Sequence, residues 1–276
     1  MAKPDESPMR FREITSAGNA LLKVFRHALA EGVTREGLLA VEGPFLVEEA
    51  LNANERAVVH SVIVAKSAEE KFSSLLARLP KESEVASVTD RIFRQVAETQ
   101  SPQGIAALVE LRKEKLESVL TAQDALPLIA CGLQDPGNLG TMMRSAQAFG
   151  ANALITLEDT VSPFNPKAVR ASAGAVFHLP IFPGEKADPL FRQLRKAGVR
   201  NIAADRHSPT SIADADLRGP LAILIGQEAA GLPSAISHQA DLLLSIPIRV
   251  GMDSLNAATA ASIMLYEVAR QRGFFH

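Results

Sequence analysis

Three loops of the sequence combine polar side chains with glycines directly after an apolar run. In AILIGQEAAGL, a run typical of a buried strand leads into Gly226, then Glu228, then Gly231. Glycines that flank an acid at this point let the backbone approach a ligand closely, because they carry no side chain. The spacing favours a ligand-binding loop, although G-x-E-x-x-G by itself is a weak signal.

The first loop along the chain is LQDPGNLGTMMRSAQAFG. A strand ends, a Pro-Gly turn follows, and a helix is expected to start near Asn138 and to end at Gly150. Arg144 lies on a different side of that helix from Met142 and Met143. Taken alone, Asn138 and Arg144 are better explained as a helix cap and a solvated surface charge than as site residues.

The third loop is LSIPIRVGMDSLNAATAASIMLYE, in which a strand stops at Pro247 and the turn carries Gly251. Ser254, Leu255 and Asn256 then open the last helix of the chain. Ser254 is a candidate N-cap for that helix. A cap and a ligand contact can be the same residue, so the two interpretations of Ser254 do not exclude each other.

The elements that would position these loops form an α/β pattern from residue 126 onward. Six apolar runs predict strands, namely LPLIACGL, ALITL, HLPIF, NIAAD, LAILIG and ADLLLSIP. Near-continuous apolar runs indicate strands that are buried on both faces, hence a mostly parallel sheet flanked by helices. Residues 126–276 are therefore predicted to be one α/β domain.

Residues 11–111 predict a smaller α/β unit in front of it. Helices are expected over NALLKVFRHALAEG, PFLVEEALNA, AEEKFSSLLARLP and DRIFRQVAE, and strands over GLLAVEG, HSVIVAK, SEVASVT and GIAALVEL. This alternation indicates a layered α/β arrangement. Residues 112–125 are charged and polar, and we interpret them as the joint between the two domains, for which a helical linker is the alternative to a flexible one.

Composition excludes several classes of protein. The 276 residues are 47% hydrophobic, and Cys131 is the only cysteine, so a disulfide framework within the chain is impossible. The apolar residues around Cys131 predict a buried structural thiol.

No apolar run approaches the roughly 20 residues that span a bilayer, and the N-terminus lacks the apolar core of a signal peptide. The cytoplasm is therefore the expected location. A net charge of −2 restricts any nucleic-acid surface to a local patch.

Together and in this order, the loops resemble the three motifs of the SpoU (TrmH-type) family of RNA ribose methyltransferases, within the SPOUT superfamily. The matching residues are Asn138, Gly140 and Arg144 in motif one, Gly226, Glu228 and Gly231 in motif two, and Ile246, Pro247, Ser254, Leu255 and Asn256 in motif three. A further block matches at Asn165, Lys167, Arg170, Ser172 and Gly174. Residues 11–111 resemble the L30e-like RNA-binding domain that often precedes this catalytic domain, through ITSAGN, LLAVEGPFLVEEAL and TQSPQGIAALV. Departures are small: Ile248 replaces a common Met, and Ala257-Ala258 replace Val-Ser.

The resemblance implies a C-terminal domain with a trefoil knot and an S-adenosylmethionine cofactor. It also implies methyl transfer to a ribose 2′-hydroxyl of a structured RNA. Backbone groups of Gly226, Ile246 and Leu255 would line the cofactor pocket. Methyl transfer by displacement needs alignment and a proton acceptor, so we expect no metal.

The resemblance also implies roles for the polar motif residues. In the family, the counterpart of Arg144 is proposed to activate the 2′-hydroxyl. A guanidinium stays protonated in nearly all protein settings, so we prefer Arg144 as a clamp on the adjacent phosphate and a stabiliser of alkoxide charge. Asn138, Ser254 and Asn256 would position the ribose and the loops, and Glu228 would orient the side chains of motif one.

Alternatives remain at this point. The chain could be an RNA-binding protein without catalysis on the same fold, although all five polar motif residues are intact. A nucleotide-dependent oxidoreductase is disfavoured because no G-x-G-x-x-G follows the first strand of either domain. A front domain suited to kinked RNA favours large-subunit ribosomal RNA over transfer RNA.

A homodimer through the C-terminal domain is expected. The last helix carries apolar or small side chains over much of its circumference from Ala257 to Leu265, more than one core-facing stripe requires. Burial of that helix within its own domain is the alternative.

Overall fold

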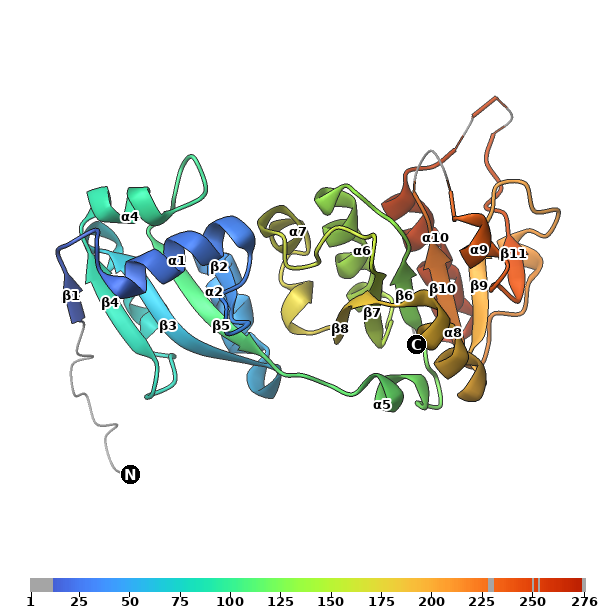
Figure 1. The fold of residues 1–276 in the computed structure, drawn as a ribbon, viewed down its shortest axis with the longest axis horizontal. Helices are drawn as coiled ribbons and strands as arrows, with labels where there is room; N and C mark the ends of the chain where they lie inside the picture. The colour runs from blue at the N-terminus through green and yellow to red at the C-terminus, as the bar shows by residue number, and fades with distance from the viewer. Residues whose placement is uncertain (1–11, 228–230, 250, 253, 275–276) are drawn as a thin grey trace. The chain divides into compact units, whose positions relative to one another are not determined.

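The computed structural model describes residues 12–227, 231–249, 251–252 and 254–274. The chain divides into two compact units, Met1–Arg112 (unit 1) and Lys113–His276 (unit 2). Each unit is built on its own β-sheet (Figure 1). Among the described residues, no helix is long and apolar enough to cross a membrane.

Unit 1 contains a mixed five-stranded sheet with the order β1-β4-β3-β5-β2. Strands β1, β4 and β3 run parallel, whereas β5 is antiparallel to both β3 and β2. The bounds are β1 Arg12–Ile14, β2 Leu39–Glu42, β3 Ala57–Ala65, β4 Glu84–Val88 and β5 Ile105–Leu111. The predicted α/β character of this unit is confirmed.

Four helices accompany the sheet of unit 1: α1 Ala20–Glu31, α2 Pro44–Asn52, α3 Ser73–Leu76 and α4 Asp90–Val96. The first begins and ends as predicted, with Asn19 as its cap and Gly32 after its last turn at a φ of 97°. The helix predicted over AEEKFSSLLARLP is wrong, since only α3 forms there. The Ser73 hydroxyl donates to the carbonyl oxygen of Glu70 at 2.8 Å, a local bond that competes with a continuous helix.

Unit 2 contains a six-stranded sheet with the order β11-β9-β10-β6-β7-β8, in which every pair is parallel. The bounds are β6 Pro127–Ala130, β7 Ala153–Leu157, β8 Ile181–Glu185, β9 Arg200–Ala204, β10 Leu221–Ile225 and β11 Leu242–Leu244. All residues of β6, β7 and β10 are buried. The prediction of a parallel sheet from continuous apolar runs is confirmed.

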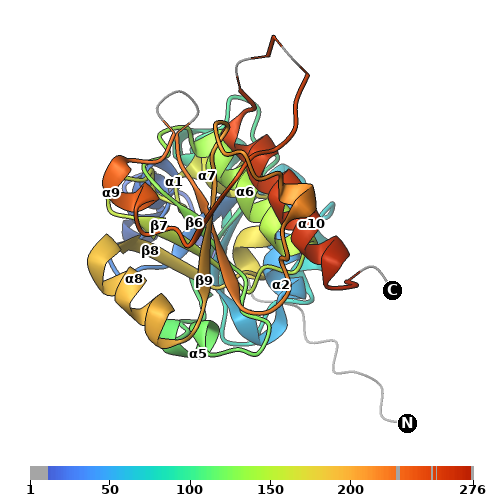
Figure 2. The same ribbon diagram turned by 90° about the vertical axis from the view of Figure 1, so that its right-hand side faces the viewer.

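Helices cover both faces of this sheet (Figure 2). On one face α6 and α10 pack with α7, and on the other α5 and α8 form a second core. The bounds are α5 Leu116–Leu120, α6 Pro136–Ala148, α7 Pro166–Ala171, α8 Ala187–Lys196, α9 Ser234–Ser237 and α10 Ala257–Gln271. The residues facing the two cores alternate along β6 and β10, as the pleat of a strand requires.

The two ends of unit 2 are tied together by a half-buried arginine. The guanidinium of Arg272, just after α10, donates to the carbonyl oxygens of Asp124, Ala125 and Gly219. Burial lowers the pKa of Arg272, although the side chain keeps its three acceptors. Of the predicted joint over 112–125, all residues from Lys113 onward, including α5, lie in unit 2.

Candidate functional site

A cavity of about 340 Å³ opens at the carboxyl ends of β9, β10 and β11. These strands are neighbours in the sheet, so the loops that follow them meet at one edge. Ligands of open α/β sheets bind at this edge. The volume lies within the range of roughly 300–1,000 Å³ that is typical of small-molecule sites.

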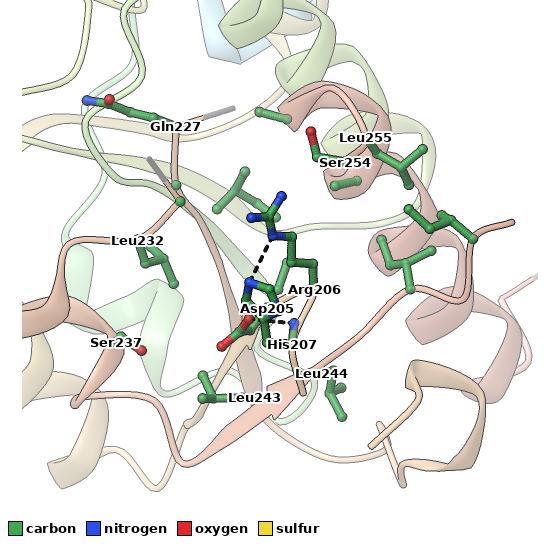
Figure 3. A pocket seen from close by; sticks show the side chains of 18 residues that line it. Asp205, Arg206, His207, Gln227, Leu232, Ser237, Leu243, Leu244, Ser254 and Leu255 are labelled. Carbon is green, nitrogen blue, oxygen red and sulfur yellow. Dashed lines mark hydrogen bonds between the residues drawn. The ribbon is translucent and has the colours of Figure 1, made fainter. Parts of the chain in front are cut away.

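Apolar residues line the cavity on several sides, with polar residues between them (Figure 3). The apolar lining residues are Leu232, Leu243, Leu244, Ile246, Ile248 and Leu255. The polar lining residues are Asp205, Arg206 and His207, which directly follow β9, together with Gln227, Ser237 and Ser254. Arg206 Nε donates to His207 Nε2 at 3.0 Å, and the His207 backbone N–H donates to Asp205 Oδ1 at 2.8 Å.

All three residues expected to contact the cofactor through their backbone line this cavity, namely Gly226, Ile246 and Leu255. A Cβ at Gly226 would lie 2.3 Å from the carbonyl oxygen of Gly231, so only glycine fits where the loop turns back. Gln227 and Gly231 close this loop with two backbone hydrogen bonds of 3.0 and 2.9 Å. Glu228 lies outside the described residues.

Motifs one and three are joined by a pair of asparagines. Asn256 Nδ2 donates to Asn138 Oδ1 at 2.9 Å. The Oδ1 of Asn256 also accepts from the backbone N–H groups of Ala258 and Thr259 and thereby caps α10. Ser254 lines the cavity two residues before this cap. One asparagine therefore sets both the start of the last helix and its link to α6.

The caps differ from the sequence-based expectations at both helices. The N-cap of α6 is Asp135, whose Oδ1 accepts from the Asn138 backbone N–H at 2.7 Å. Asn138 consequently lies in the first turn with its side chain available to Asn256. The N-cap of α10 is Asn256 rather than Ser254. The helices begin where predicted within a few residues, but competing side-chain acceptors occupy the cap positions.

Arg144 is exposed on α6, whereas the neighbouring Met142 and Met143 are fully buried, as the helical spacing predicts. It does not line the cavity, and it has no ion-pair partner among the described residues. Helix α6 is held against α7 at Gly140, where a Cβ would lie 2.3 Å from the carbonyl oxygen of Ala168. On another side it meets α10, where the hydroxyls of Ser145 and Ser262 lie 2.7 Å apart.

Sequence reasoning missed two groups of residues at this edge of the sheet. One is Arg206 and His207, whose signal was available because they follow the apolar run NIAAD as the three motif loops follow theirs. The other is a pair of amides on one carbonyl oxygen: Gln227 Nε2 and Gln134 Nε2 both donate to Gly132, at 2.7 and 3.0 Å. These bonds connect the loop after β10 to the loop after β6.

The residues of the additional block lie in and around α7. Asn165 caps this helix by accepting from the Lys167 backbone N–H at 2.9 Å, and Lys167 and Arg170 are exposed. Ser172 is fully buried, and Gly174 has a φ of 90°. Among the described residues, no group of three or more His, Cys, Asp or Glu side chains could hold a metal ion.

A parallel sheet with a ligand cavity at its carboxyl edge places unit 2 among the open α/β folds that bind a small molecule at strand ends. Comparison with known sequences identifies the family within this broad class of folds. The SpoU rRNA Methylase family matches residues 125–266, and an MRM3-like substrate binding domain matches residues 34–107. The chain belongs to the SpoU rRNA methylase family, and it is an RNA 2′-O-ribose methyltransferase.

Three similar proteins cover both units or most of them. The 23S rRNA (guanosine(2553)-2′-O)-methyltransferase RlmP of Bacillus subtilis is 31% identical, over 93% of this chain and 99% of its own. The 23S rRNA (uridine(2479)-2′-O)-methyltransferase of Streptomyces viridochromogenes is 34% identical, over 73% of this chain and 72% of its own. The crystal structure of an AdoMet-bound rRNA methyltransferase from Sinorhizobium meliloti has a TM-score of 0.80 at 30% identity, covering 94% of this chain and 98% of that one.

Proposed function

We propose that this enzyme transfers the methyl group of S-adenosylmethionine to a ribose 2′-hydroxyl of 23S ribosomal RNA. The observation that carries the proposal is the junction of Asn138 and Asn256, which brings motif one to the edge of the cavity that motifs two and three line. Both similar methyltransferases described by substrate act on 23S rRNA, which supports ribosomal over transfer RNA. They act on a uridine and a guanosine, so likeness to them does not select a base.

The cavity fits S-adenosylmethionine by its chemistry. The apolar lining, which includes Leu243, Leu244 and Leu255, suits a flat adenine ring, and the polar lining residues suit an amino-acid end. Backbone groups of Gly226, Ile246 and Leu255 would hold the nucleoside portion. When bound, the cofactor supplies an electrophilic methyl group on a sulfonium.

The protein's own contribution is alignment and charge stabilisation. Arg144 stands outside the cavity as a permanent cation, where it can bind the phosphate beside the target ribose and stabilise negative charge on the 2′-oxygen. Asn138, Ser254 and Asn256 would position the ribose, and Glu228 would orient the side chains of motif one. Holding the 2′-oxygen in line with the methyl group can contribute several kcal/mol, because orientation is settled before reaction.

The test is to replace Arg144 by alanine. We expect methylation to be abolished while cofactor affinity, measured by calorimetry, stays within a few fold, because Arg144 does not line the cavity. Arg192→Ala, an exposed arginine of α8, is the matched control and should retain activity. Turnover close to wild type in Arg144→Ala would refute the assignment. Mapping 2′-O-methyl positions in total RNA with and without the gene would identify the target.

The proposal also includes a trefoil knot in unit 2 and a homodimer. Family membership supports a trefoil knot, in which the last helix, α10, threads back through a loop of unit 2. It also supports a homodimer through unit 2, for which α10 offers a surface. Tyr266 of that helix is 47% exposed and meets Phe149 edge-on, with ring centroids 5.9 Å apart. Sedimentation at micromolar concentration tests the dimer, and a species near the chain mass of 29.5 kDa would refute it.

A further inference from the structure

Three neighbouring loops of unit 2 are joined at Gly132. Strand β6 pairs with β10 on one side and with β7 on the other, so the loop after β6 lies between the loops that follow these two strands. On the β7 side, the Gly132 N–H donates to Thr160 Oγ1 at 2.9 Å. On the β10 side, Gln227 Nε2 donates to the Gly132 carbonyl oxygen at 2.7 Å. Both backbone polar groups of this buried glycine therefore fix the loop between β6 and α6.

The backbone at Gly132 is shaped to receive the side chain of Gln227. Gly132 has a φ of 74°, which favours glycine, and a Cβ there would lie 3.1 Å from Gln227 Nε2. A larger residue at this position would therefore displace the amide. A carbonyl oxygen only accepts hydrogen bonds, so Gln227 must present the nitrogen of its amide to Gly132. Figure 3 shows this amide at the far end of the Gln227 side chain, pointing away from Arg206 and Ser254.

This contact links the cavity to the start of α6. The loop after β10 lines the cavity at Gln227 and its neighbours. Gly132 lies three residues before Asp135, the N-cap of α6, whose Oδ1 accepts from the Asn138 backbone N–H at 2.7 Å. A ligand that orders the loop after β10 therefore acts on the first turn of α6 through one amide.

We propose that Gln227 is a positioning residue for methyl transfer. Its amide holds the loop between β6 and α6 against the loop that lines the cavity, and thereby sets where α6 places Asn138 and Arg144 relative to the methyl donor. Gln134 donates to the same carbonyl oxygen at 3.0 Å, but from within the loop after β6, so it does not make this link. Gln227 fills a position that the G-x-E-x-x-G spacing of motif two leaves open. The inference rests on the proposed function, because it presumes that reaction.

The first test is Gln227→Met, which keeps a side chain of similar length but removes the hydrogen-bond donor. The full-length variant is assayed with S-adenosylmethionine and transcribed 23S rRNA, and its affinity for S-adenosylhomocysteine is measured by calorimetry. We expect kcat to fall about five-fold or more, because α6 loses one of its attachments. The affinity for S-adenosylhomocysteine should stay within about three-fold, since the backbone that lines the cavity is retained. Gln193→Met, at an exposed glutamine of α8, is the matched control and should keep the wild-type kcat.

A second variant, Gln227→Glu, tests the donor itself. The introduced carboxyl group can donate to the Gly132 carbonyl oxygen only while it is protonated, and its ionised form would place a negative oxygen against that acceptor. The kcat of this variant relative to wild type should therefore rise as the pH is lowered from about 8 to about 5. The same ratio for Gln227→Met should not change with pH. Because Gln227→Glu is compared with itself at two pH values, this test holds even if Gln227→Met does not fold.

The contrary results are distinct. A wild-type kcat in Gln227→Met would overturn the inference. Equal losses of kcat and of affinity for S-adenosylhomocysteine would mean that Gln227 only shapes the cavity, and a ratio for Gln227→Glu that is the same at both pH values would show that the donor is not what Gln227 contributes. Wild type that binds no S-adenosylhomocysteine would refute the proposed function instead, and Gln193→Met would then bind none either.

Discussion

Asn256 is the residue on which two structural tasks converge. Its Oδ1 caps α10, and its Nδ2 reaches Asn138 on α6. Asn138 takes part in the second task without being a cap, since Asp135 caps α6. The two asparagines can therefore be used to separate the stability of the helix from the geometry of the site.

We predict that Asn256→Ala and Asn138→Ala both reduce methylation, because each removes the bond between motifs one and three. Only Asn256→Ala also removes a helix cap, which costs about 1 kcal/mol of unfolding free energy. Urea denaturation gives the stability and a methyl-transfer assay gives the rate. Equal destabilisation by the two variants would show that the cap is not what Asn256 contributes.

Cys131 follows β6 and is 1% exposed, so the expected buried thiol is confirmed. Burial raises its pKa from 9.0 to about 12. Well below pH 9 the thiol is protonated in both folded and unfolded chains, and its titration contributes no pH dependence. Above that, the unfolded chain loses the proton first, so unfolding is favoured as pH rises toward 12.

We predict that the unfolding free energy of wild type falls more steeply above pH 9 than that of Cys131→Ala. One titrating group accounts for a difference of about 1.4 kcal/mol per pH unit. Denaturant titrations at several pH values between 7 and about 10.5 compare the slopes. Lysine and tyrosine side chains titrate in both proteins, so the difference isolates Cys131. Parallel slopes would mean that the thiol is accessible in the folded state.

Among the elements, α6 has the largest part in arranging the site. It carries Asn138 and Arg144, packs closely on α7 at Gly140, and meets α10 through Ser145. A displacement of this helix would move both polar residues of motif one relative to the cavity. The absence of a side chain at Gly140 is what permits the close approach.

We predict that Gly140→Ala destabilises unit 2 by about 1–3 kcal/mol, because the new methyl group would meet the backbone carbonyl of Ala168 rather than a movable side chain. Alanine has the higher helix propensity, so a stabilised variant would contradict the packing argument. Thermal or urea unfolding gives the comparison. Gln147→Ala, an exposed position of the same helix, is the control and should be nearly neutral.

The elements that could be predicted from sequence are those whose apolar pattern is long. All six strands of unit 2 follow from continuous apolar runs, and α1 follows from the spacing of Leu22, Phe25 and Leu29. Strand β1 could not be predicted, because it is three residues long and two of them, Arg12 and Glu13, are exposed and polar. Segments this short are fixed by pairing with a neighbour rather than by their own pattern.

The candidate site was predictable only in part for a similar reason. The motif residues could be assigned from the sequence, because the three loops taken together and in order resemble the motifs of the family. The contribution of Arg206 depends on β9 lying between β11 and β10, an order that no local pattern contains. The two amides on the Gly132 carbonyl likewise come from residues 134 and 227, which become neighbours only in the folded sheet.

At the scale of the whole molecule, the chain is two units with separate sheets and separate cores. The matches to known families follow the same division, with a substrate-binding domain in residues 34–107 and the methylase family in residues 125–266. The cavity is lined entirely by residues of unit 2 among those described. Cofactor binding should therefore be separable from RNA recognition.

We predict that a chain lacking residues 1–111 folds, binds S-adenosylhomocysteine with an affinity close to wild type, and methylates its RNA poorly. Unit 2 retains α5 and both of its cores in such a variant. Calorimetry and a methyl-transfer assay measure the two properties. An insoluble or cofactor-free product would show that the boundary is misplaced, and full activity would show that unit 1 is dispensable for the RNA.

The sheet of unit 2 also determines when during synthesis the enzyme can form. Strand β6 is synthesised before β10, so one of its edges remains unpaired until residues 221–225 have been made. The hydrogen bonds of Arg272 to Asp124 and Gly219 form only after α10 has been synthesised. Unit 1 can fold while the ribosome is still translating, because its strands end at Leu111. A chain whose synthesis stops before β10 therefore consists of a folded first unit joined to a sheet with an open central edge, a product prone to aggregation and a substrate for chaperones and proteases.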